Sequence, residues 1–386
     1  MSWAIALAVG LTGTLGGCEA PQIDAPLSFR PQPGALISVF PKENDFPGRS
    51  AVVTYYTTDV LVPTHMLTVT AMVFTPAGPP PVGGWPVMAW GDGMPGLADD
   101  CAPTATDVSR GPYGPYLLSW LKRGFAVIMT DQPRRGRPFY LNAREEGMSM
   151  LDAVRAVTTN DGRFSRRTVL AGHGPGAHAA LSAAGMVAEY APELRIGAVV
   201  VSGAPYWDSR SAATLAGQVR GESGHQRDPE LRELMLMGAS LAAAMPTGDA
   251  ARAFSPQAQP VYQQAGTLCP VPFMALLATS GLTPATALTA SAFEDLKPAF
   301  DWAAYPTLRI QTPVFFAIGE KDVQVPGAAQ DRLAADLCRA GTRMRVRHYP
   351  DQNHMSALFV SSDEGMTFAQ NALRGVVPGS DCAALR

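Results

Sequence analysis

Charged side chains are scarce in this sequence, and neither sign dominates. Only 16% of its 386 residues are Asp, Glu, Lys or Arg, and the formal net charge is −3. This small excess gives no electrostatic reason to expect a nucleic acid as partner. Hydrophobic residues make up 47% of the chain, a share that fits a compact folded protein and argues against disorder. The length allows a large core, or one domain carrying a sizeable insertion.

Phosphate loops, dinucleotide fingerprints and zinc motifs are absent from the sequence, so we expect no cofactor and no metal. His173 and His178 lie without other metal-ligating residues, and a packing or surface role is the default interpretation for both. Arg134, Arg135 and Arg137 form a basic run that could hold an anionic ligand. A solvated loop is the favoured interpretation of that run.

The first residues indicate a targeting signal. Ser2 to Gly17 contain no charged side chain and form an apolar run too short to span a bilayer as a helix. The run ends in Leu15-Gly16-Gly17-Cys18, which resembles the lipobox of bacterial lipoproteins. We therefore predict a signal peptide over 1–17, lipidation of Cys18 and a Pro-rich tether over 18–35. The alternative is a buried N-terminal helix. The resemblance implies export to the outer membrane or cell surface, held there by the lipid anchor.

Four cysteines remain if Cys18 is lipidated: Cys101, Cys269, Cys338 and Cys382. An even number in an oxidising compartment indicates two disulfides, and four cysteines allow three pairings. We favour Cys338 with Cys382, because a C-terminal tail that would otherwise fray gains most from a covalent link. Free buried thiols are the alternative.

The order of predicted elements indicates an α/β protein. Two runs rich in Val, Thr and Tyr, 51–58 and 67–75, predict an antiparallel start. From Pro86 onward short apolar strands alternate with amphipathic helices, which predicts a mostly parallel sheet with helices on both faces. The further predicted strands are 87–90, 126–130, 168–171, 198–202, 314–318 and 344–348, and the helices are 116–122, 146–157, 177–190, 328–340 and 364–374. Ser361 and Glu364 have capping-box spacing just before the last of these helices.

Strand alternation is not visible over residues 203–307. This stretch contains an Ala-, Met- and Leu-rich helical segment at 228–245 and a second apolar run at 273–288. We interpret it as a helical cap inserted between two strands of a core that comprises 36–202 and 308–386.

A glycine stands at the centre of the most informative motif. Gly172-His173-Gly174-Pro175-Gly176 follows an apolar strand and opens a small-residue helix. That context is the nucleophile elbow of α/β-hydrolases, G-x-S-x-G between a strand and a helix. Downstream, Asp322 ends the strand in VFFAIGEKD and His354 follows the strand in MRVRHYPDQNH. The order elbow, acid, histidine is the one used by the α/β-hydrolase fold, which we therefore predict, with Gly174 at the nucleophile position.

At family level the sequence resembles the secretory lipases, lipase-A-like triacylglycerol lipases and esterases. The resemblance rests on the elbow and on GWPVMAWGDGMPGLADDCAP, LDAVRA, FAIGEKDVQVP and HYPDQNH, and it runs from about Thr54 to the C-terminus. It implies a helical lid over an apolar substrate pocket. It also implies a serine at the position of Gly174, a catalytic acid and base at Asp322 and His354, and a His-Gly pair where this chain has Asp92-Gly93.

Three departures from that pattern fall on the chemistry itself. Gly174 has no side chain, so an acyl-enzyme route has no nucleophile. Pro175 has no N–H for the oxyanion, and one such donor is typically worth about 2.7–4 kcal/mol. Asp92 places a carboxylate on the loop Asp92-Gly93-Met94 that should supply the other donor. This charge would oppose the oxyanion unless it is protonated or paired.

Two functions are compatible with these residues. The first is a degenerate hydrolase that binds an apolar or acyl ligand, or an extracytoplasmic protein partner, and keeps Asp322 and His354 as a structural hydrogen bond. The second is a weak ester hydrolase in which His354 acts as general base on a water in the space left by the missing serine. A relocated nucleophile such as Ser202 or Ser356 is less favoured, because each is more typical of a strand end or a loop.

Overall fold

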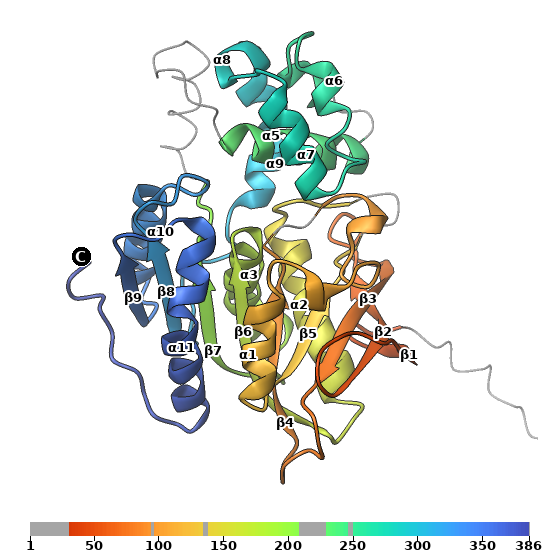
Figure 1. Cartoon of the computed structure of the whole chain (residues 1–386), viewed down its shortest axis with the longest axis vertical. Coiled ribbons are helices and arrows are strands. Elements are labelled where there is room, and N and C mark those ends of the chain that lie inside the picture. Colours follow the sequence, from red (N-terminus) through yellow and green to blue (C-terminus); the bar gives the residue numbers. More distant parts are fainter. Residues whose placement is uncertain (1–30, 94–95, 134–137, 208–228, 246–249, 386) are drawn as a thin grey trace, which may run out of the picture. The chain divides into compact units, whose positions relative to one another are not determined.

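A mixed β-sheet forms the centre of the computed structural model, which describes residues 31–93, 96–133, 138–207, 229–245 and 250–385. Within these residues nine strands pair in the order β1-β2-β3-β5-β4-β6-β7-β8-β9 (Figure 1). They are β1 (Leu36–Pro41), β2 (Arg49–Thr58), β3 (Met66–Thr75), β4 (Trp85–Gly91), β5 (Ala126–Thr130), β6 (Phe164–His173), β7 (Arg195–Ser202), β8 (Val314–Gly319) and β9 (Met344–Tyr349). Pairing is antiparallel from β1 to β5 and parallel through the rest of the sheet. The predicted α/β class and mostly parallel sheet are confirmed.

Every predicted strand overlaps an observed one, but β1 was not predicted. Its six residues alternate only weakly in burial, and Val39 and Phe40 are exposed at the edge of the sheet. A strand without a buried face gives no clear period-2 signal. The predicted signal peptide, Cys18 and most of the predicted tether lie outside the described residues, as do Met94 and the three arginines of the basic run.

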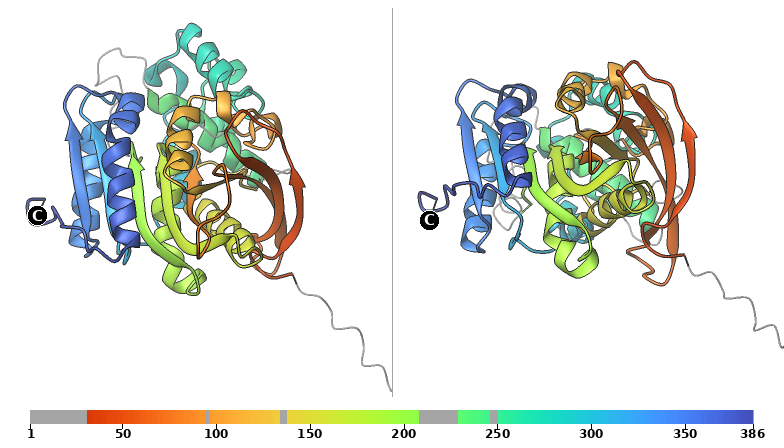
Figure 2. Two further views of the ribbon diagram at one scale, coloured as in Figure 1. Left: turned by 60° about the horizontal axis from the view of Figure 1, so that its bottom comes forward. Right: turned by 90° about the horizontal axis from the view of Figure 1, so that it is seen from below.

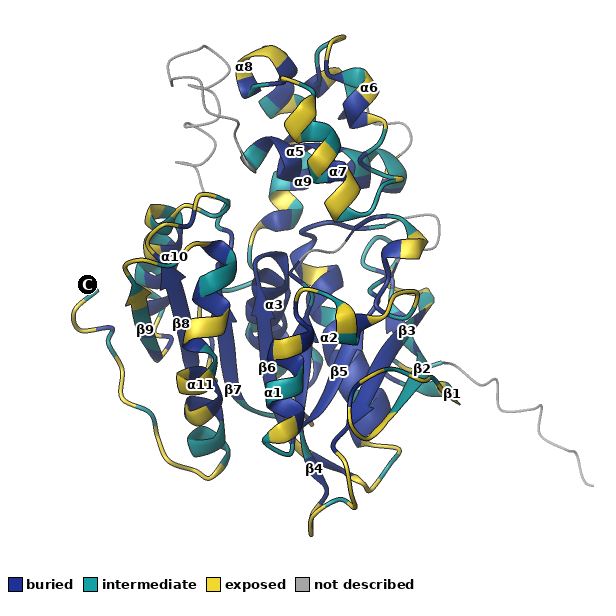
Figure 3. Ribbon diagram, in the orientation of Figure 1, coloured by how far each residue is buried: buried dark blue, intermediate teal, exposed yellow. Residues whose placement is uncertain are grey.

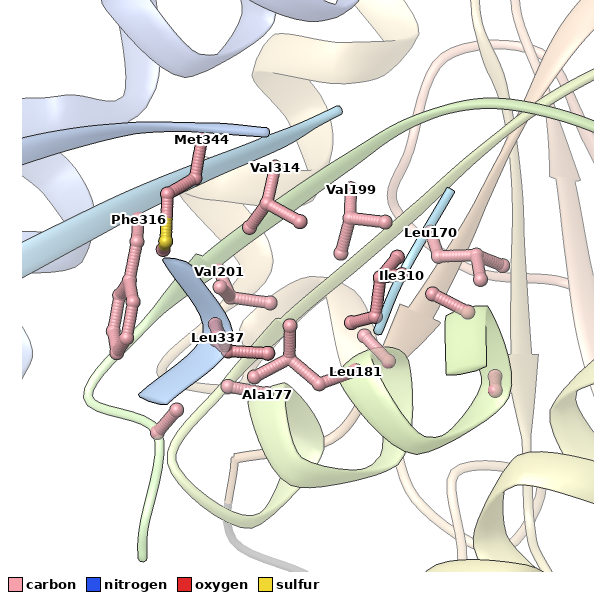
Figure 4. Packing of buried hydrophobic residues seen from close by; sticks show 14 of the residues in the cluster. Leu170, Ala177, Leu181, Val199, Val201, Ile310, Val314, Phe316, Leu337 and Met344 are labelled. Atoms are coloured by element: carbon pink, nitrogen blue, oxygen red, sulfur yellow. The ribbon is translucent and has the colours of Figure 1, made fainter. Parts of the chain in front are cut away.

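Helices cover both faces of the sheet (Figures 1 and 2). One face carries α1 (Gly114–Lys122) and α11 (His354–Leu373), and the other carries α2 (Ala143–Thr158), α3 (Pro175–Tyr190) and α10 (Gly327–Arg339). Figure 4 shows the second layer, where Leu181 and Leu337 pack against Val199 and Val201 of β7. Alternate residues of β7, such as Val200, join the core on the opposite face. The strands are therefore buried on both sides, as Figure 3 shows for the central strands, and this explains their continuous apolar runs.

Helix α11 begins ten residues earlier than its predicted start. Asn353 is its N-cap, and its side chain accepts a hydrogen bond from the backbone N–H of Ser356, which completes a capping box. The predicted cap at Ser361 and Glu364 is wrong, because both residues lie inside the helix. Capping-box spacing recurs by chance within helices, and the hydroxyl of Ser361 donates to the carbonyl of Leu358 instead. His354 is therefore the first residue of α11.

The connection between β7 and β8 is helical where it is described. It contains α5 (Pro229–Ala244), α6 (Gln259–Tyr262), α7 (Pro270–Thr279), α8 (Pro284–Ala287) and α9 (Ala292–Ala303), and in the described part the only β-pairing is a single bridge between Phe254 and Leu288. These helices share an apolar core and lie above the carboxyl ends of the parallel strands (Figure 1). The boundaries at 203 and 307 and the role of a lid stay predictions. Among the described helices, none has the length and apolar character needed to cross a membrane.

Two disulfides link distant segments. Cys338 in α10 bonds Cys382, which confirms the favoured pairing, and Cys101 bonds Cys269 at the start of α7. The first bond holds the C-terminal tail against β9, where the backbone N–H of Asp381 donates to the carbonyl of Met344. The tail thereby covers an edge strand that would otherwise expose unpaired backbone groups.

The LDAVRA stretch has a structural role in α2. Asp152 is buried and accepts hydrogen bonds from Thr57 and Tyr190, each at 2.7 Å, and from Arg155. Burial raises the pKa of this carboxyl to about 6 against the lowering effect of its hydrogen bonds. The network joins α2, β2 and the end of α3, so this part of the resemblance reflects packing around the site.

Candidate active site

The sharp turn between β6 and α3 is built for glycine at three positions, but for different reasons. A Cβ on Gly172 would lie 2.0 Å from the carbonyl oxygen of Gly176, and one on Gly176 would lie 1.9 Å from that of Gly91. Both outer glycines are therefore required by close backbone contact. Gly174 differs, since a Cβ there would meet no backbone atom closer than 3.3 Å, the carbonyl oxygen of Gly93. Only its φ of 54° favours glycine, and the elbow of this fold is a strained turn.

The acid and the histidine meet beside this turn. Both residues are buried, and Nδ1 of His354 lies 2.7 Å from Oδ2 of Asp322. Oδ2 also accepts from the side-chain amide of Gln330, and Oδ1 accepts from the backbone N–H groups of Gln324 and Val325. Four donors thus hold the Asp322 carboxylate in the loop after β8. Because Nδ1–H donates to the carboxylate, Nε2 of neutral His354 carries the free lone pair.

His354 faces the position of the missing side chain. Its Nε2 would lie 3.1 Å from a Cβ on Gly174. The structure therefore brings together Gly174, Asp322 and His354 in the arrangement of a triad without its nucleophile. The three come from the ends of β6 and β8 and the start of α11, at the carboxyl edge of the parallel sheet. From β4 the chain crosses to one side of the sheet to form β5, and from β6 onward each strand is added on the other side. The boundary between β4 and β6 is therefore a topological switch point, which is where open α/β sheets bind ligands.

His354 packs against residues that the sequence did not identify as its neighbours. The ring of His173 lies 4.1 Å from the ring of His354, centre to centre. A Cβ on Gly203 would approach Cε1 of His354 to 2.6 Å and Cε1 of His173 to 3.2 Å, so both rings pack close to this glycine. Burial lowers the pKa of His173 well below its usual value, and the neighbouring His354 adds to this effect. His173 is therefore a neutral packing partner.

The two serines considered as relocated nucleophiles have other partners. The hydroxyl of Ser202 lies 2.8 Å from Nδ1 of His173, and Ser202 is buried. The hydroxyl of Ser356 accepts a hydrogen bond from the backbone N–H of Asn353 in the cap of α11. Each serine hydroxyl therefore has a hydrogen-bond partner other than His354.

The oxyanion side of the turn has an altered set of groups. Pro175 is the first residue of α3, so the position that follows the elbow residue has no N–H to donate. The carbonyl oxygen of Gly93, an acceptor, faces the Cβ position of Gly174. Burial raises the pKa of Tyr113, and the negative charge of Asp92 raises it further.

Charged side chains of the cap line the space next to His354. A cavity of about 40 Å³ is bounded by His354 and Pro175 and by Arg232 and Glu233 of α5. Arg232 donates to Glu233, which also accepts from the hydroxyl of Tyr140. One water needs roughly 10–15 Å³ of cavity volume, so this cavity has room for a few waters and not for an acyl chain. Adjacent Arg and Glu in a helix give no sequence signal for this role.

Larger cavities lie elsewhere in the described part of the chain. One of about 230 Å³ is bounded by Asp92, Tyr113 and the start of α7. Another, of about 530 Å³, lies between β1–β3 and the end of α2, and none of the candidate site residues lines it. In the described part of the chain no group of three or more His, Cys, Asp or Glu residues is arranged to hold a metal ion.

The elbow helix is also connected to the cap through His178, which the sequence left as a packing or surface residue. Its Nδ1 lies 2.8 Å from Oε2 of Glu146, and its Nε2 lies 2.9 Å from the carbonyl oxygen of Ala303 at the end of α9. Because a carbonyl only accepts, Nε2 is protonated and donates to it. His178 thus joins α3 to both α2 and the last helix of the cap.

Comparisons with known proteins point to lipases. The family model described as Secretory lipase matches residues 115–210, a segment that includes the elbow. Lipase A of Moesziomyces aphidis is 32% identical over 93 residues, which span 24% of this chain and 20% of that protein. This chain therefore covers about a fifth of the curated relative that it matches.

Solved structures resemble the whole fold. Candida antarctica lipase A in its closed state superposes with a TM-score of 0.73 at 20% identity, covering 91% of this chain and 85% of that one. The rice cell wall degrading esterase LipA from Xanthomonas oryzae gives 0.67 at 16% identity, covering 90% and 98%. At these identities the likeness shows the fold. The chain thus resembles the secretory lipases over residues 115–210, and it shares the α/β-hydrolase fold of these lipase and esterase structures.

Proposed function

We propose that this protein is a catalytically degenerate relative of the lipases that binds a small apolar ligand beside the elbow and does not turn it over. The observation that carries the proposal is the glycine at position 174, which His354 faces directly. A Cβ placed there would lie 3.1 Å from Nε2, so the base is in position while the nucleophile is absent. Without a serine, no acyl-enzyme forms.

The oxyanion side supports the same conclusion. Pro175 removes one backbone donor, a loss that typically lowers kcat by about 10²- to 10³-fold in serine hydrolases. Asp92 adds a carboxylate near the place where negative charge would develop, which is unfavourable when ionised. A fold that lacks the nucleophile and one N–H donor to the oxyanion can still bind a ligand. The cavity of about 230 Å³ beside Asp92 supplies the apolar surface for a ligand, and an extracytoplasmic protein is the alternative partner.

The cellular setting belongs to the proposal. Two disulfides favour an oxidising compartment outside the cytosol, as does the likeness to secretory lipases. We propose that Cys18 carries the lipid anchor and that the protein resides at the outer membrane or cell surface. Metabolic labelling with radioactive palmitate tests this, and we expect the label to disappear in Cys18→Ser. Equal labelling of both forms would refute the anchor.

Hydrolysis of short- and long-chain nitrophenyl esters tests the absence of turnover. The purified protein is compared with His354→Ala, which removes the one base that faces the elbow. We expect equal rates at the level of the buffer background. Turnover that is lost in His354→Ala would contradict the proposal.

A second function is favoured by the small cavity next to His354. It is lined by His354 itself and has room for a few waters, so a water could be deprotonated there without a covalent intermediate. This weak hydrolase would show His354-dependent rates with no burst of nitrophenol. The absence of a burst separates it from a hidden acyl-enzyme.

A further inference from the structure

The cavity of about 530 Å³ lies at the β1 edge of the sheet, between β1–β3 and the end of α2 (Figure 1). Leu36 and Val39 of β1 form part of its wall, and Val39 is 52% exposed. The volume falls within the range of roughly 300–1,000 Å³ that is usual for drug-sized ligands. Its deeper lining is apolar and buried, and it consists of Val53, Val73, Ala156, Val157 and Phe164.

The charged side chains of this lining do not cancel completely. Arg163 and Asp161 neutralise each other, because the guanidinium donates to both carboxylate oxygens, with the shortest contact at 2.6 Å. Lys42 donates to the backbone carbonyl of Thr104. The lining as a whole has three cations and two acids, namely Lys42, Arg49 and Arg163, and Glu43 and Asp161. It therefore carries an excess of one positive charge.

Arg49 combines a fixed backbone with an available charge. Gly48, just before it, has a φ of 112°, and a Cβ there would lie 2.1 Å from the carbonyl oxygen of Thr75, so the turn is pressed against the end of β3. The backbone N–H of Arg49 donates to the hydroxyl of Thr75 at 3.3 Å, and this hydroxyl donates to the carbonyl of Arg49 at 3.2 Å. Among the residues that the structure describes, the guanidinium of Arg49 has no hydrogen bond or ion pair.

Glu43 is the lining acid that could compete for this guanidinium. It is exposed, and within the described ranges no ion pair joins it to Arg49. An ion pair between two exposed side chains contributes little, because water screens both charges. A carboxylate that is held at the mouth by its own buried hydrocarbon chain would therefore compete well with Glu43.

We propose that this cavity binds a free alkyl carboxylate, with its chain against Val53, Val73 and Phe164 and its carboxylate beside Arg49. Removal of the chain from water supplies the affinity, and the planar guanidinium selects a carboxylate because it can donate two parallel hydrogen bonds to it. The volume suits one chain, so the inferred occupant is a free acid and not a membrane lipid with two chains. The inference does not rest on the proposed function, because the cavity shares no residue with the elbow site.

Three ligands that share one chain length test the proposal: octanoate, 1-octanol and octylamine, titrated calorimetrically into the full-length protein at pH 7. We expect octanoate to bind at least about tenfold more tightly than 1-octanol, and octylamine to bind most weakly. Arg49→Gln should abolish the advantage of octanoate and leave 1-octanol unchanged. Glu43→Gln should increase this advantage, because it removes the competing acid.

The matched control is Arg309→Gln. Arg309 is also exposed, its guanidinium has no partner among the described residues, and it does not line the cavity. This variant should preserve the advantage of octanoate. Val39→Trp, a change at an exposed position of β1, should weaken all three ligands by filling the mouth, and unchanged binding in this variant would place the ligand elsewhere and overturn the proposal.

Further outcomes would also contradict the inference. Failure of octanoate to bind, octylamine binding as tightly as octanoate, or an octanoate advantage that survives Arg49→Gln overturns it. Displacement of bound octanoate by phosphatidylglycerol vesicles would identify a two-chain lipid as the occupant and overturn the free acid. Ester turnover that depends on His354 would overturn the proposed function and leave this inference standing.

Discussion

The two halves of the candidate site differ in how strongly the fold constrains them. On one side, Asp322 accepts four hydrogen bonds and His354 begins α11, so both residues hold loops in place. On the other side, Gly174 is held by backbone hydrogen bonds alone, and a Cβ there would require a shift of only a few tenths of an ångström in His354, although its positive φ would be strained. The difference teaches that a retained Asp–His pair is weak evidence for catalysis. Its hydrogen bonds connect the loop after β8 to the start of α11 whether or not a nucleophile is present.

The elbow itself repeats this contrast on a smaller scale. A Cβ added to either outer glycine would lie about 2 Å from a backbone atom, so neither can be replaced without moving β4 or α3. The central residue is limited by its positive φ. Packing therefore excludes side chains at the outer positions, while only backbone conformation opposes one at the position that would do chemistry.

The largest effect is expected from Asp322→Ala. The substitution leaves the Nδ1–H of His354, two backbone N–H groups and an amide of Gln330 without their acceptor in a buried place. We expect the free energy of unfolding to fall by about 3–5 kcal/mol in urea denaturation. The control is Asp331→Ala, which breaks an exposed Asp–His pair with His348 at 2.8 Å and should lower it by less than about 1 kcal/mol. Similar losses in both variants would contradict a structural role for the buried pair.

Repair of the elbow should give the next largest effect. Gly174→Ser alone restores a nucleophile opposite His354 but leaves Pro175 without a donor. Adding Pro175→Gln should raise kcat on nitrophenyl esters by about 10²- to 10³-fold, or 2.7–4 kcal/mol, over the single variant. Asp92→His should raise it further by removing the carboxylate. Gly174→Ala with Pro175→Gln is the inactive control. Full lipase-like rates in the single variant would show that the missing donor is unimportant.

The smallest effect is expected from Gly174→Ala. A side chain at φ 54° is strained, so the free energy of unfolding should fall by about 1–2 kcal/mol. Gly162→Ala is the matched control, since a Cβ there meets nothing within 4 Å and its φ is not positive. That variant should change stability by no more than about 1 kcal/mol. If Gly174→Ala proved as destabilising as Asp322→Ala, the contrast between the halves would fail.

Sequence patterns predicted well where a signal is local and repeated. The alternation of apolar strands and helices gave the parallel part of the sheet because such strands are buried on both faces. The elbow was recognisable since its glycines are spaced by a rigid turn. The start of α11 was missed because Ser361 and Glu364 match the sequence pattern of a capping box, whereas the real box pairs Asn353 with Ser356 and does not match it. Strand β1 was missed because an exposed edge strand has no regular pattern of burial.

The sequence by itself determined the fold class, the order of elbow, acid and histidine, and the absence of a side chain at position 174. These are properties of residue identity and short-range periodicity. Only the tertiary structure decided that His173 packs on His354, that Arg232 and Glu233 line the space beside it, and that Cys101 and Cys269 line a separate cavity. These contacts join residues that are far apart in the chain, although Arg232 and Glu233 themselves are consecutive residues of α5. Their proximity follows from how the sheet, the helices and the cap pack together, which no local pattern specifies.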